Sequence, residues 1–540
     1  MKRRDFLKNS ALLTAVSSLP LKSLAQGTQW AATKLHDDMP IAKIENSQFN
    51  SVDFNGDDID RPHDLLWNID GYIAKKGGEP SVSEDLDVAI IGGGMSGLIS
   101  AHYLGNKKIA VFEGDRRFGG NSKGEQYKDS TYSIGAAYIC EPEKDSAIES
   151  LLSDINVLQY GRLEDGADTS VFHQGRIHKH FWAGATASSA KAQYAKIFQH
   201  LNEIYNDSDW DWQGDFAKSI DNLSFEQWLQ KEFGDVHEHI KEYFQLYGWS
   251  SFCGSISEIS AFQFLGFIAA ETENIMAFPG GNSFITQGLV RSLRQRHGHS
   301  ALRSGAFVLR VEAQSDSVTV LYENNVGELV KVRAKHAIMA CQKFVARRLL
   351  PQMSEVQGNA IHFLPYRAYL VGNAILKKNF QSPSYELFQI KGQMPKDPTA
   401  MNRGDRTFTD ICFGSWAGKD QNEHSVLSLY HGIPYDGARQ FLFSPMSHDK
   451  YREKHETELK TILPGLGISE SDLLGLRLTR WGHSLPLSQK GLLASGQAAL
   501  ASESILGRIH FANQDNWMNP CFETAQEVAE AATSLILENI

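Results

Sequence analysis

Hydrophobic residues in the first third of the chain occur in short continuous runs separated by glycine-rich and polar stretches. One run ends at Ile91 and a second covers residues 109–112, and each is short and apolar enough for a buried strand. Between them lies a glycine turn followed by a helical stretch. This order predicts a βαβ unit with two parallel strands and a crossover helix.

Helical spacing dominates residues 146–278. Within them, residues 190–205 are amphipathic, and Ser224 begins a capping box ahead of another helix. The sequence Pro-Gly-Gly-Asn at residues 279–282 predicts a loop that leads into a helix over residues 284–293.

The second half of the chain returns to strand-like alternation. Three consecutive strands are expected at residues 306–311, 317–322 and 331–341. Later elements are expected at residues 366–376 (strand), 451–462 (helix), 507–515 (strand) and 523–535 (helix).

Composition sets the scale of the molecule. The chain has 540 residues, of which 42% are hydrophobic and 22% are charged. This length allows two or three hydrophobic cores, and the composition is that of an ordinary globular protein. Residues 26–80 are polar, acidic and without apolar periodicity, so they predict an arm over the globular body rather than a domain.

The first 25 residues look like a twin-arginine export signal. Arg3 and Arg4 precede a modest apolar stretch through Leu19, and residues 23–25, Ser-Leu-Ala, offer a small-residue cleavage site. Lys2 stands where Ser or Thr is common. The segment makes the twin-arginine export machinery an expected partner and the periplasm the expected location.

Charge and cysteine spacing exclude several classes of protein. The net charge is −11, and loss of the first 25 residues, with five basic residues and one acidic residue, makes it −15. Such a surface disfavours nucleic acid and mildly favours cationic ligands. No apolar run reaches the roughly 18 residues that span a bilayer, so no stable membrane insertion is expected. The five cysteines have no metal-ligand or haem-attachment spacing, so no metal site is expected.

The glycines between the first two strands have the spacing of a nucleotide-binding fingerprint. Gly92 permits a tight turn, Gly94 lets a pyrophosphate approach the backbone, and Gly97 lets the helix pack closely on its strand. The free N–H groups at the helix start can hold the phosphates. Glu113 lies 21 residues beyond Gly92, where a carboxylate can bind ribose hydroxyls.

The residues after Glu113 distinguish FAD from NAD. They read Gly-Asp-Arg-Arg-Phe-Gly-Gly-Asn-Ser-Lys, a pattern that resembles the FAD-binding domain of the flavin amine oxidases. The glycine pair at residues 119–120 suits a larger nucleotide, because the backbone must come close to pyrophosphate and ribityl groups. Asn121 stands where the family usually has Arg, and Ser122 and Lys123 are the expected substitutes for its phosphate contact.

Together with residues 279–282, 480–483 and 507–515, these motifs resemble the bacterial spermidine-dehydrogenase-like branch of the flavin amine oxidases, over residues 84–540. The resemblance implies an α/β, two-domain flavin amine oxidase-like fold, with a discontinuous Rossmann-type FAD-binding domain and an α+β substrate domain. It implies FAD as the cofactor. The residues that it places at FAD are Gly92, Gly94, Met95, Ser96, Gly97, Glu113, Gly114, Arg117, Gly119, Gly120, Asn121, Ser122, Gly135, Ala136, Val308, Asn513, Asp515 and Thr524.

The same resemblance assigns the domains. Residues 84–145, 279–360 and 501–540 are expected to form the FAD-binding domain. Residues 146–278 and 361–500 are expected to form the substrate domain.

The implied reaction is oxidation of a C–N bond in an amine, polyamine-like or other. Hydride passes from the carbon beside the nitrogen to flavin N5, and the imine then hydrolyses. The cofactor supplies the redox chemistry, so the protein must mainly position the carbon and bind the neutral amine. His483, beside Trp481, is the candidate for amine orientation or proton acceptance, because an unperturbed histidine pKa of about 6.5 suits that role.

Two other functions fit the same cofactor motifs. One is a flavin-dependent desaturase or isomerase of an apolar substrate, which predicts an apolar tunnel and membrane contact. The other is a non-catalytic exported flavoprotein that acts as an electron-transfer or maturation partner. Oxygen, a quinone and a haem protein all remain candidate electron acceptors. Covalent attachment of FAD at Cys521 and a dimer contact through the arm also remain open.

Overall fold

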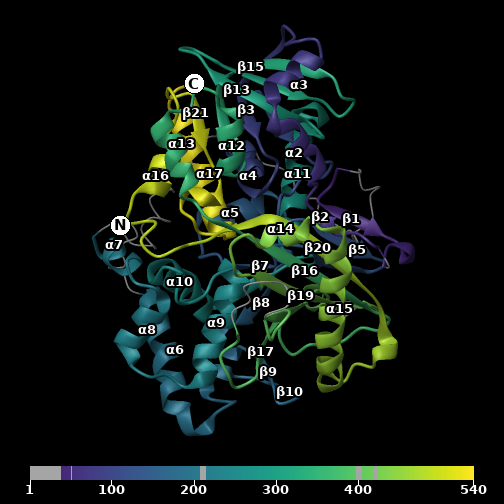
Figure 1. The fold of residues 1–540 in the computed structure, drawn as a ribbon, viewed down its shortest axis with the longest axis vertical. Coiled ribbons are helices and arrows are strands. Elements are labelled where there is room, and N and C mark those ends of the chain that lie inside the picture. The colour runs from purple at the N-terminus through teal and green to yellow at the C-terminus, as the bar shows by residue number, and fades with distance from the viewer. Residues whose placement is uncertain (1–37, 50, 207–214, 397–403, 419–421) are drawn as a thin grey trace.

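The computed structural model describes residues 38–540, apart from residue 50 and residues 207–214, 397–403 and 419–421. The expected export signal therefore lies outside the described residues. Figure 1 shows a sheet-based unit at the top and a larger mixed unit below it. None of the helices within the described ranges combines the length and apolarity needed to cross a membrane.

The upper unit is built on a seven-stranded sheet. Its strands are β3 (Val82–Ile91), β4 (Ile109–Glu113), β12 (Leu302–Ser304), β13 (Phe307–Ala313), β14 (Val318–Glu323), β15 (Leu329–Met339) and β21 (Ile509–Phe511). The order is β12-β4-β3-β15-β14-β13, and β21 pairs with β15. Strands β12, β4, β3, β15 and β21 pair in parallel. The three consecutive strands that the sequence predicted, β13, β14 and β15, form an antiparallel meander.

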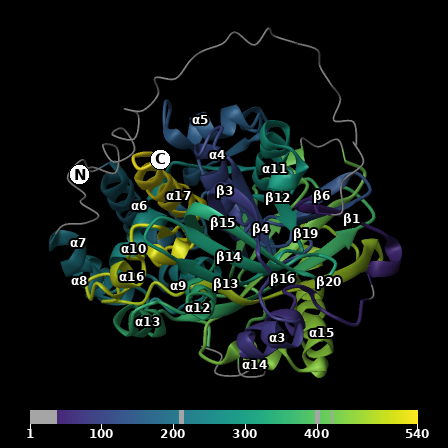
Figure 2. The same ribbon diagram turned by 90° about the horizontal axis from the view of Figure 1, so that it is seen from above.

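Both faces of this sheet are buried, as alternation along β3 shows. Val88 and Ile90 pack into one core with the helices of one face, and Ala89 and Ile91 pack into a second core on the other. The helices on the first face are α4 (Met95–Tyr103), α11 (Ser283–His297) and α17 (Phe522–Leu537), with α5 (Ala147–Asp154) above them in Figure 2. The second face is covered by α12 (Lys343–Leu349), which α13 (Glu355–His362) adjoins.

The lower unit contains an eight-stranded mixed sheet in the order β10-β9-β17-β18-β19-β16-β20-β2. Its strands are β2 (Asn55–Gly56), β9 (Val171–His173), β10 (Arg176–His178), β16 (Tyr366–Leu376), β17 (Glu386–Ile390), β18 (Asp410–Phe413), β19 (Ser425–Ile433) and β20 (Leu473–Pro486). Beside it lie α6 (Lys191–Asn206), α7 (Asp215–Asp221), α8 (Phe225–Phe233), α9 (Glu238–Phe252), α10 (Ala261–Ile268), α14 (Ala438–Leu442) and α15 (Pro445–Ile462), with α16 (Gln497–Ala501) near α13 (Figure 1).

Two three-stranded sheets join the units. One consists of β1 (Ile41–Ile44), β5 (Gly124–Tyr127) and β6 (Ser130–Ser133), and the other of β7 (Tyr138–Cys140), β8 (Arg162–Asp165) and β11 (Asn274–Ala277). Within residues 38–80, the part of the polar N-terminal stretch that the structure describes, the chain forms β1, β2, α2 (Asp60–Trp67) and α3 (Ile69–Lys75). Pro62 fits the first turn of α2, because the first helical N–H groups have no intrahelical acceptor.

The strongly patterned elements are confirmed. The βαβ unit is β3-α4-β4, and the expected helix over 190–205 is α6. Ser224 and Gln227 form the expected capping box, with Ser224 Oγ accepting from Gln227 N at 3.2 Å and the Gln227 side chain accepting from Ser224 N at 2.9 Å.

Candidate active site

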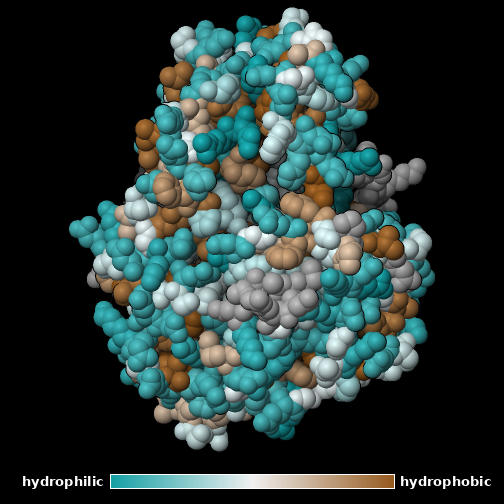
Figure 3. Space-filling model, in the orientation of Figure 1, coloured by the Kyte–Doolittle hydropathy of each residue, from teal (hydrophilic) through white to brown (hydrophobic). Residues whose placement is uncertain are grey.

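A continuous cavity of about 1530 Å³ lies between the two units. Drug-sized ligands usually occupy roughly 300–1,000 Å³, so this space is large enough for a dinucleotide and a second molecule. Hydrophilic side chains cover most of the face seen in Figure 3, and hydrophobic residues are scattered over it.

The first glycine motif forms one end of the cavity and has the expected geometry. Gly92 has a φ of +115°, and an added Cβ would lie 2.7 Å from the Ala340 oxygen. A Cβ on Gly97 would lie 2.0 Å from the Gly92 oxygen, so only glycine lets α4 approach β3 this closely. Gly94 is the N-cap of α4 and supplies no side chain to the first-turn N–H groups. These donors are therefore available to a phosphate.

The carboxylate at the end of β4 also lines this end of the cavity. Glu113 accepts hydrogen bonds from Gly93 N at 2.8 Å and Asp115 N at 2.9 Å. The second glycine pair, Gly119 and Gly120, faces Gly94 across the loop. This pairing of a buried carboxylate with two glycine turns fits a dinucleotide.

The residues that replace the family arginine point in different directions. Asn121 donates to the Ser484 oxygen at 2.9 Å, and Lys123 pairs with Asp115. Lys123 also lies 5.8 Å from the centroid of the Trp481 ring. Asn121, Ser122 and Lys123 all line the cavity.

Most of the residues expected at FAD line this one cavity, although they come from distant parts of the chain. Those that do are Gly92, Gly94, Met95, Ser96, Glu113, Gly114, Gly119, Gly120, Asn121, Ser122, Gly135, Ala136, Val308, Asn513 and Thr524. Gly97 lies behind them in the α4–β3 contact, as its packing role requires.

Two expected contacts need correction. Asp515 is fully buried and does not line the cavity, because the turn after β21 directs its carboxylate to Lys343 Nζ at 2.7 Å and to the Tyr366 hydroxyl at 2.6 Å. Arg117 also lies outside the lining, since its guanidinium donates to the Pro40 oxygen at 3.3 Å and the Gly124 oxygen at 3.1 Å. Asp515 and Arg117 therefore stabilise the wall of the cavity and do not line the space expected for FAD.

His483 and Trp481 both line the cavity from β20, but His483 is not poised to accept a proton. Its Nε2 lies 2.6 Å from a guanidinium nitrogen of Arg439. Burial, and then the charge of Arg439, lower the pKa of His483 to about 4, which corrects the expectation of an ordinary histidine pKa. The Trp481 indole donates to the Ile134 oxygen at 2.7 Å, which fixes the ring as a wall.

Three carboxyl groups that sequence reasoning missed lie at the cavity wall on the lower unit: Glu271, Glu386 and Asp410. Pairing of β17 with β18 sets Glu386 opposite Cys412, two residues from Asp410 on the same face. The ligand atoms of Glu386, Asp410 and Cys412 lie within 4.8 Å of one another. No spacing motif connects these positions, so only the tertiary structure identifies them.

These three carboxyl groups have no basic side chain as a partner in the ranges that the structure describes. Within the described part of the chain, Glu271, Glu386 and Asp410 form no ion pair with Lys, Arg or His. Desolvation by burial raises the pKa of Glu271 to about 8 and that of Asp410 to about 6. Burial, and then the charge of Asp410, raise the pKa of Glu386 well above its usual range.

Hydrogen bonds leave part of the carboxyl cluster unsatisfied. The Tyr138 hydroxyl donates to Glu271 at 3.0 Å, and the Thr409 hydroxyl donates to Asp410 Oδ1 at 2.5 Å. Asp410 is 1% exposed, and its Oδ2 makes no hydrogen bond of good geometry with any described residue. Ser250 and Glu386 also interact with the Asp410 carboxyl, and a further donor from a bound molecule would complete its hydrogen bonding.

Tyrosine rings connect the carboxyl cluster with the glycine loops. Tyr369 and Tyr430 line the cavity with their centroids 5.9 Å apart at 74°. The Tyr430 hydroxyl donates to the Gly135 oxygen at 2.6 Å, next to the loop expected at the flavin. Such rings can hold a cation against their faces.

The fold and the two-part cavity define a class: a flavin-dependent oxidoreductase with a Rossmann-type cofactor site and an adjoining substrate site. The glycine turns, Glu113 and the open N-terminus of α4 fit FAD. Residues 95–533 match the family described as flavin containing amine oxidoreductase. The chain belongs to this family, and it is an FAD-dependent oxidoreductase.

Known proteins resemble the chain at low identity. Oxidoreductase PigB of Serratia sp. (strain ATCC 39006) is 22% identical over 494 residues, which cover 81% of this chain and 72% of PigB. Putrescine oxidase bound to putrescine has a TM-score of 0.63 and 16% identity, covering 84% of this chain and 99% of that one. Cyclohexylamine oxidase from Brevibacterium oxydans IH-35A has a TM-score of 0.61 and 16% identity, covering 84% and 99%.

Proposed function

We propose that this enzyme oxidises a C–N bond of an amine that enters the cavity as a cation and is recognised by Glu271, Glu386 and Asp410. The observation that carries the proposal is the carboxyl cluster, which lines the cavity without a basic partner among the described residues. An ammonium group supplies the positive charge that these carboxyls lack and further hydrogen-bond donors. An apolar substrate would leave them uncompensated.

Substrate chemistry follows from the same residues. When bound, FAD supplies at N5 the acceptor for the hydride that leaves the carbon beside the amine nitrogen. The nitrogen must first lose its proton, and a carboxylate beside it can accept that proton. Glu271, whose pKa is raised to about 8, is better matched to this role than His483, whose pKa is lowered to about 4.

Several finer features belong to the same proposal. The spermidine-dehydrogenase-like motifs favour a polyamine-like substrate, and residues 1–25 favour twin-arginine export to the periplasm. Oxygen, a quinone and a haem protein remain the candidate acceptors. Readmission of air to the reduced enzyme distinguishes oxygen from the other two.

An anaerobic titration of the FAD-loaded enzyme with polyamines, monoamines and amino acids tests the proposal. One amine class should bleach the flavin spectrum. Asp410→Asn should raise the amine concentration for half-maximal bleaching by roughly tenfold or more while FAD stays bound, because hydrogen bonds to charged groups contribute about 1.5–3 kcal/mol.

Asp221→Asn is the matched control, since Asp221 is also a buried aspartate whose pKa burial raises, but it lies outside the cavity. Equal effects of the two substitutions would remove the carboxyl cluster from substrate recognition.

Bleaching of the flavin by apolar hydrogen donors alone would favour the desaturase or isomerase function. Bleaching by no small molecule would favour the non-catalytic flavoprotein.

A further inference from the structure

The N-terminal stretch before the family region crosses the cavity from one unit to the other. Residues 55–67 precede residue 95, where the match to the family begins. Gly56, Asp57, Arg61, His63 and Trp67 line the same cavity as the glycine loops. We propose that residues 55–67 form a strap that retains FAD in its site.

One end of the strap is fixed to the lower unit. Strand β2 pairs with β20, and Gly482 N donates to the Asp57 carboxylate at 2.5 Å. Gly56 has a φ of +96°, and an added Cβ would lie 2.2 Å from the Arg480 oxygen. A side chain at residue 56 would therefore push the strap away from β20.

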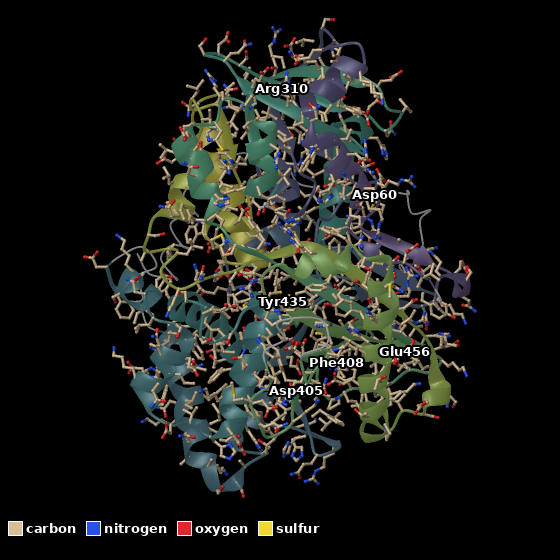
Figure 4. The ribbon with its side chains drawn as sticks, in the orientation of Figure 1. Asp60, Arg310, Asp405, Phe408, Tyr435 and Glu456 are labelled. Atoms are coloured by element: carbon tan, nitrogen blue, oxygen red, sulfur yellow. The ribbon has the colours of Figure 1, made fainter. Side chains whose placement is uncertain are left out.

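The other end of the strap is fixed to the upper unit by Arg61 and by the apolar packing of Leu65 and Leu66. Arg61 donates to the Gly114 oxygen at 3.2 Å and the Gly305 oxygen at 3.3 Å, and it pairs with Glu323 at 3.2 Å. Its guanidinium also lies 5.4 Å from the centroid of the Phe307 ring. Asp60, at the start of α2, lies higher in Figure 4 than Tyr435, which lines the cavity from the lower unit. The strap thus spans the two walls of the cavity.

The Arg61 end lies at the nucleotide end of the cavity. Gly114 follows Glu113, which faces the first glycine turn, and Phe307 precedes Val308, which also lines the cavity. A planar guanidinium suits this place, because it can bind phosphate or ribose oxygens and can stack on an aromatic base. FAD is expected to enter or leave only when the strap lifts, so the strap should slow FAD release.

The test measures the rate of FAD release from the loaded protein, followed by the rise in free-flavin fluorescence after dilution. Arg61→Ala is expected to raise this rate by about tenfold or more, which corresponds to about 1.4 kcal/mol. Gly56→Ala should have the same effect from the opposite end. Lys76→Ala is the matched control, because Lys76 also pairs with Glu323 from the N-terminal stretch but does not line the cavity. It should change the rate by less than about twofold.

Release at the wild-type rate in both Arg61→Ala and Gly56→Ala would overturn the strap. If one variant does not fold, the rate of FAD release from the other variant still tests the proposal. Hydrogen exchange of the wild-type protein gives an independent measurement: amides of residues 57–67 should exchange more slowly when FAD is bound, and equal exchange with and without FAD would also overturn the proposal. These measurements need no amine, so they stand whether or not the enzyme oxidises one.

Discussion

A carboxylate that is buried without a cation nearby is unstable relative to its protonated form. Asp410 is buried and Glu271 and Glu386 are half-buried, all without a described cation nearby, and their raised pKa values express this condition. His483 shows which property of a site residue the sequence could not predict. Its place in the cavity could be predicted from the motif around it, whereas its ionisation depends on Arg439, a neighbour 44 residues away in the chain.

The raised pKa of Glu271 predicts a pH dependence of stability. An acid whose pKa rises from 4.5 to about 8 on folding stabilises the protein fully below pH 4.5, and this contribution is lost as pH rises through 8. Glu271→Gln removes the loss because glutamine stays neutral. Between pH 6 and pH 9, the FAD-free wild type should therefore lose about 3 kcal/mol more unfolding free energy than Glu271→Gln.

Denaturant unfolding of both proteins at the two pH values measures this difference. The exposed Glu470 provides the control, since Glu470→Gln should follow the wild type at both pH values. Parallel losses in wild type and Glu271→Gln would show that Glu271 ionises without penalty in the folded protein.

At the scale of elements, the helices and strands that the sequence pattern predicted correctly are those that local interactions determine. The β3-α4-β4 unit, the meander and the capped helix α8 follow from apolar spacing, glycine positions and a capping box. The strap could not be predicted in this way, because α2 is short and mostly polar. Contacts with segments distant in the chain hold it in place, namely β20, Gly114, Gly305 and the core around Leu65. Asp515 was misplaced for the same reason: its partner Lys343 lies on another element.

Two glycines at the start of α4 should separate cofactor binding from folding. A Cβ on Gly94 would meet only Gly120 at 3.6 Å, an ordinary contact, and it would reduce the space where the phosphates are expected. Gly94→Ala should abolish FAD binding and leave the unfolding free energy of the FAD-free protein within about 0.5 kcal/mol of wild type. Gly97→Ala should instead destabilise the FAD-free protein, because its Cβ would lie 2.0 Å from the Gly92 oxygen.

Denaturant unfolding without FAD and a fluorescence titration with FAD measure the two effects. Tight FAD binding by Gly94→Ala would place the pyrophosphate elsewhere in the cavity. An unchanged stability of Gly97→Ala would mean that α4 can move away from β3 at no cost.

At the scale of the molecule, the chain passes repeatedly between two units, and the active site belongs to neither alone. The glycine loops belong to the upper unit, whereas Asp410, Tyr369 and Trp481 come from the eight-stranded sheet of the lower one. Sequence reasoning identified the cofactor end because a dinucleotide demands glycines at fixed spacing. The substrate end of the cavity has no motif of fixed spacing, because its carboxyl groups lie on three elements that only the fold brings together.

The net charge of −11 predicts how the substrate reaches this site. A cation approaching an acidic protein is steered by long-range attraction, and salt weakens that attraction as the Debye length falls from about 30 Å at 0.01 M to about 8 Å at 0.15 M. The second-order rate constant for flavin reduction by the amine should therefore fall severalfold over this range in stopped-flow measurements. Dithionite, an anionic reductant, should respond in the opposite direction, because salt screens its repulsion. If the two reductants changed in the same direction, the amine would not approach as a cation drawn by the charge of the protein.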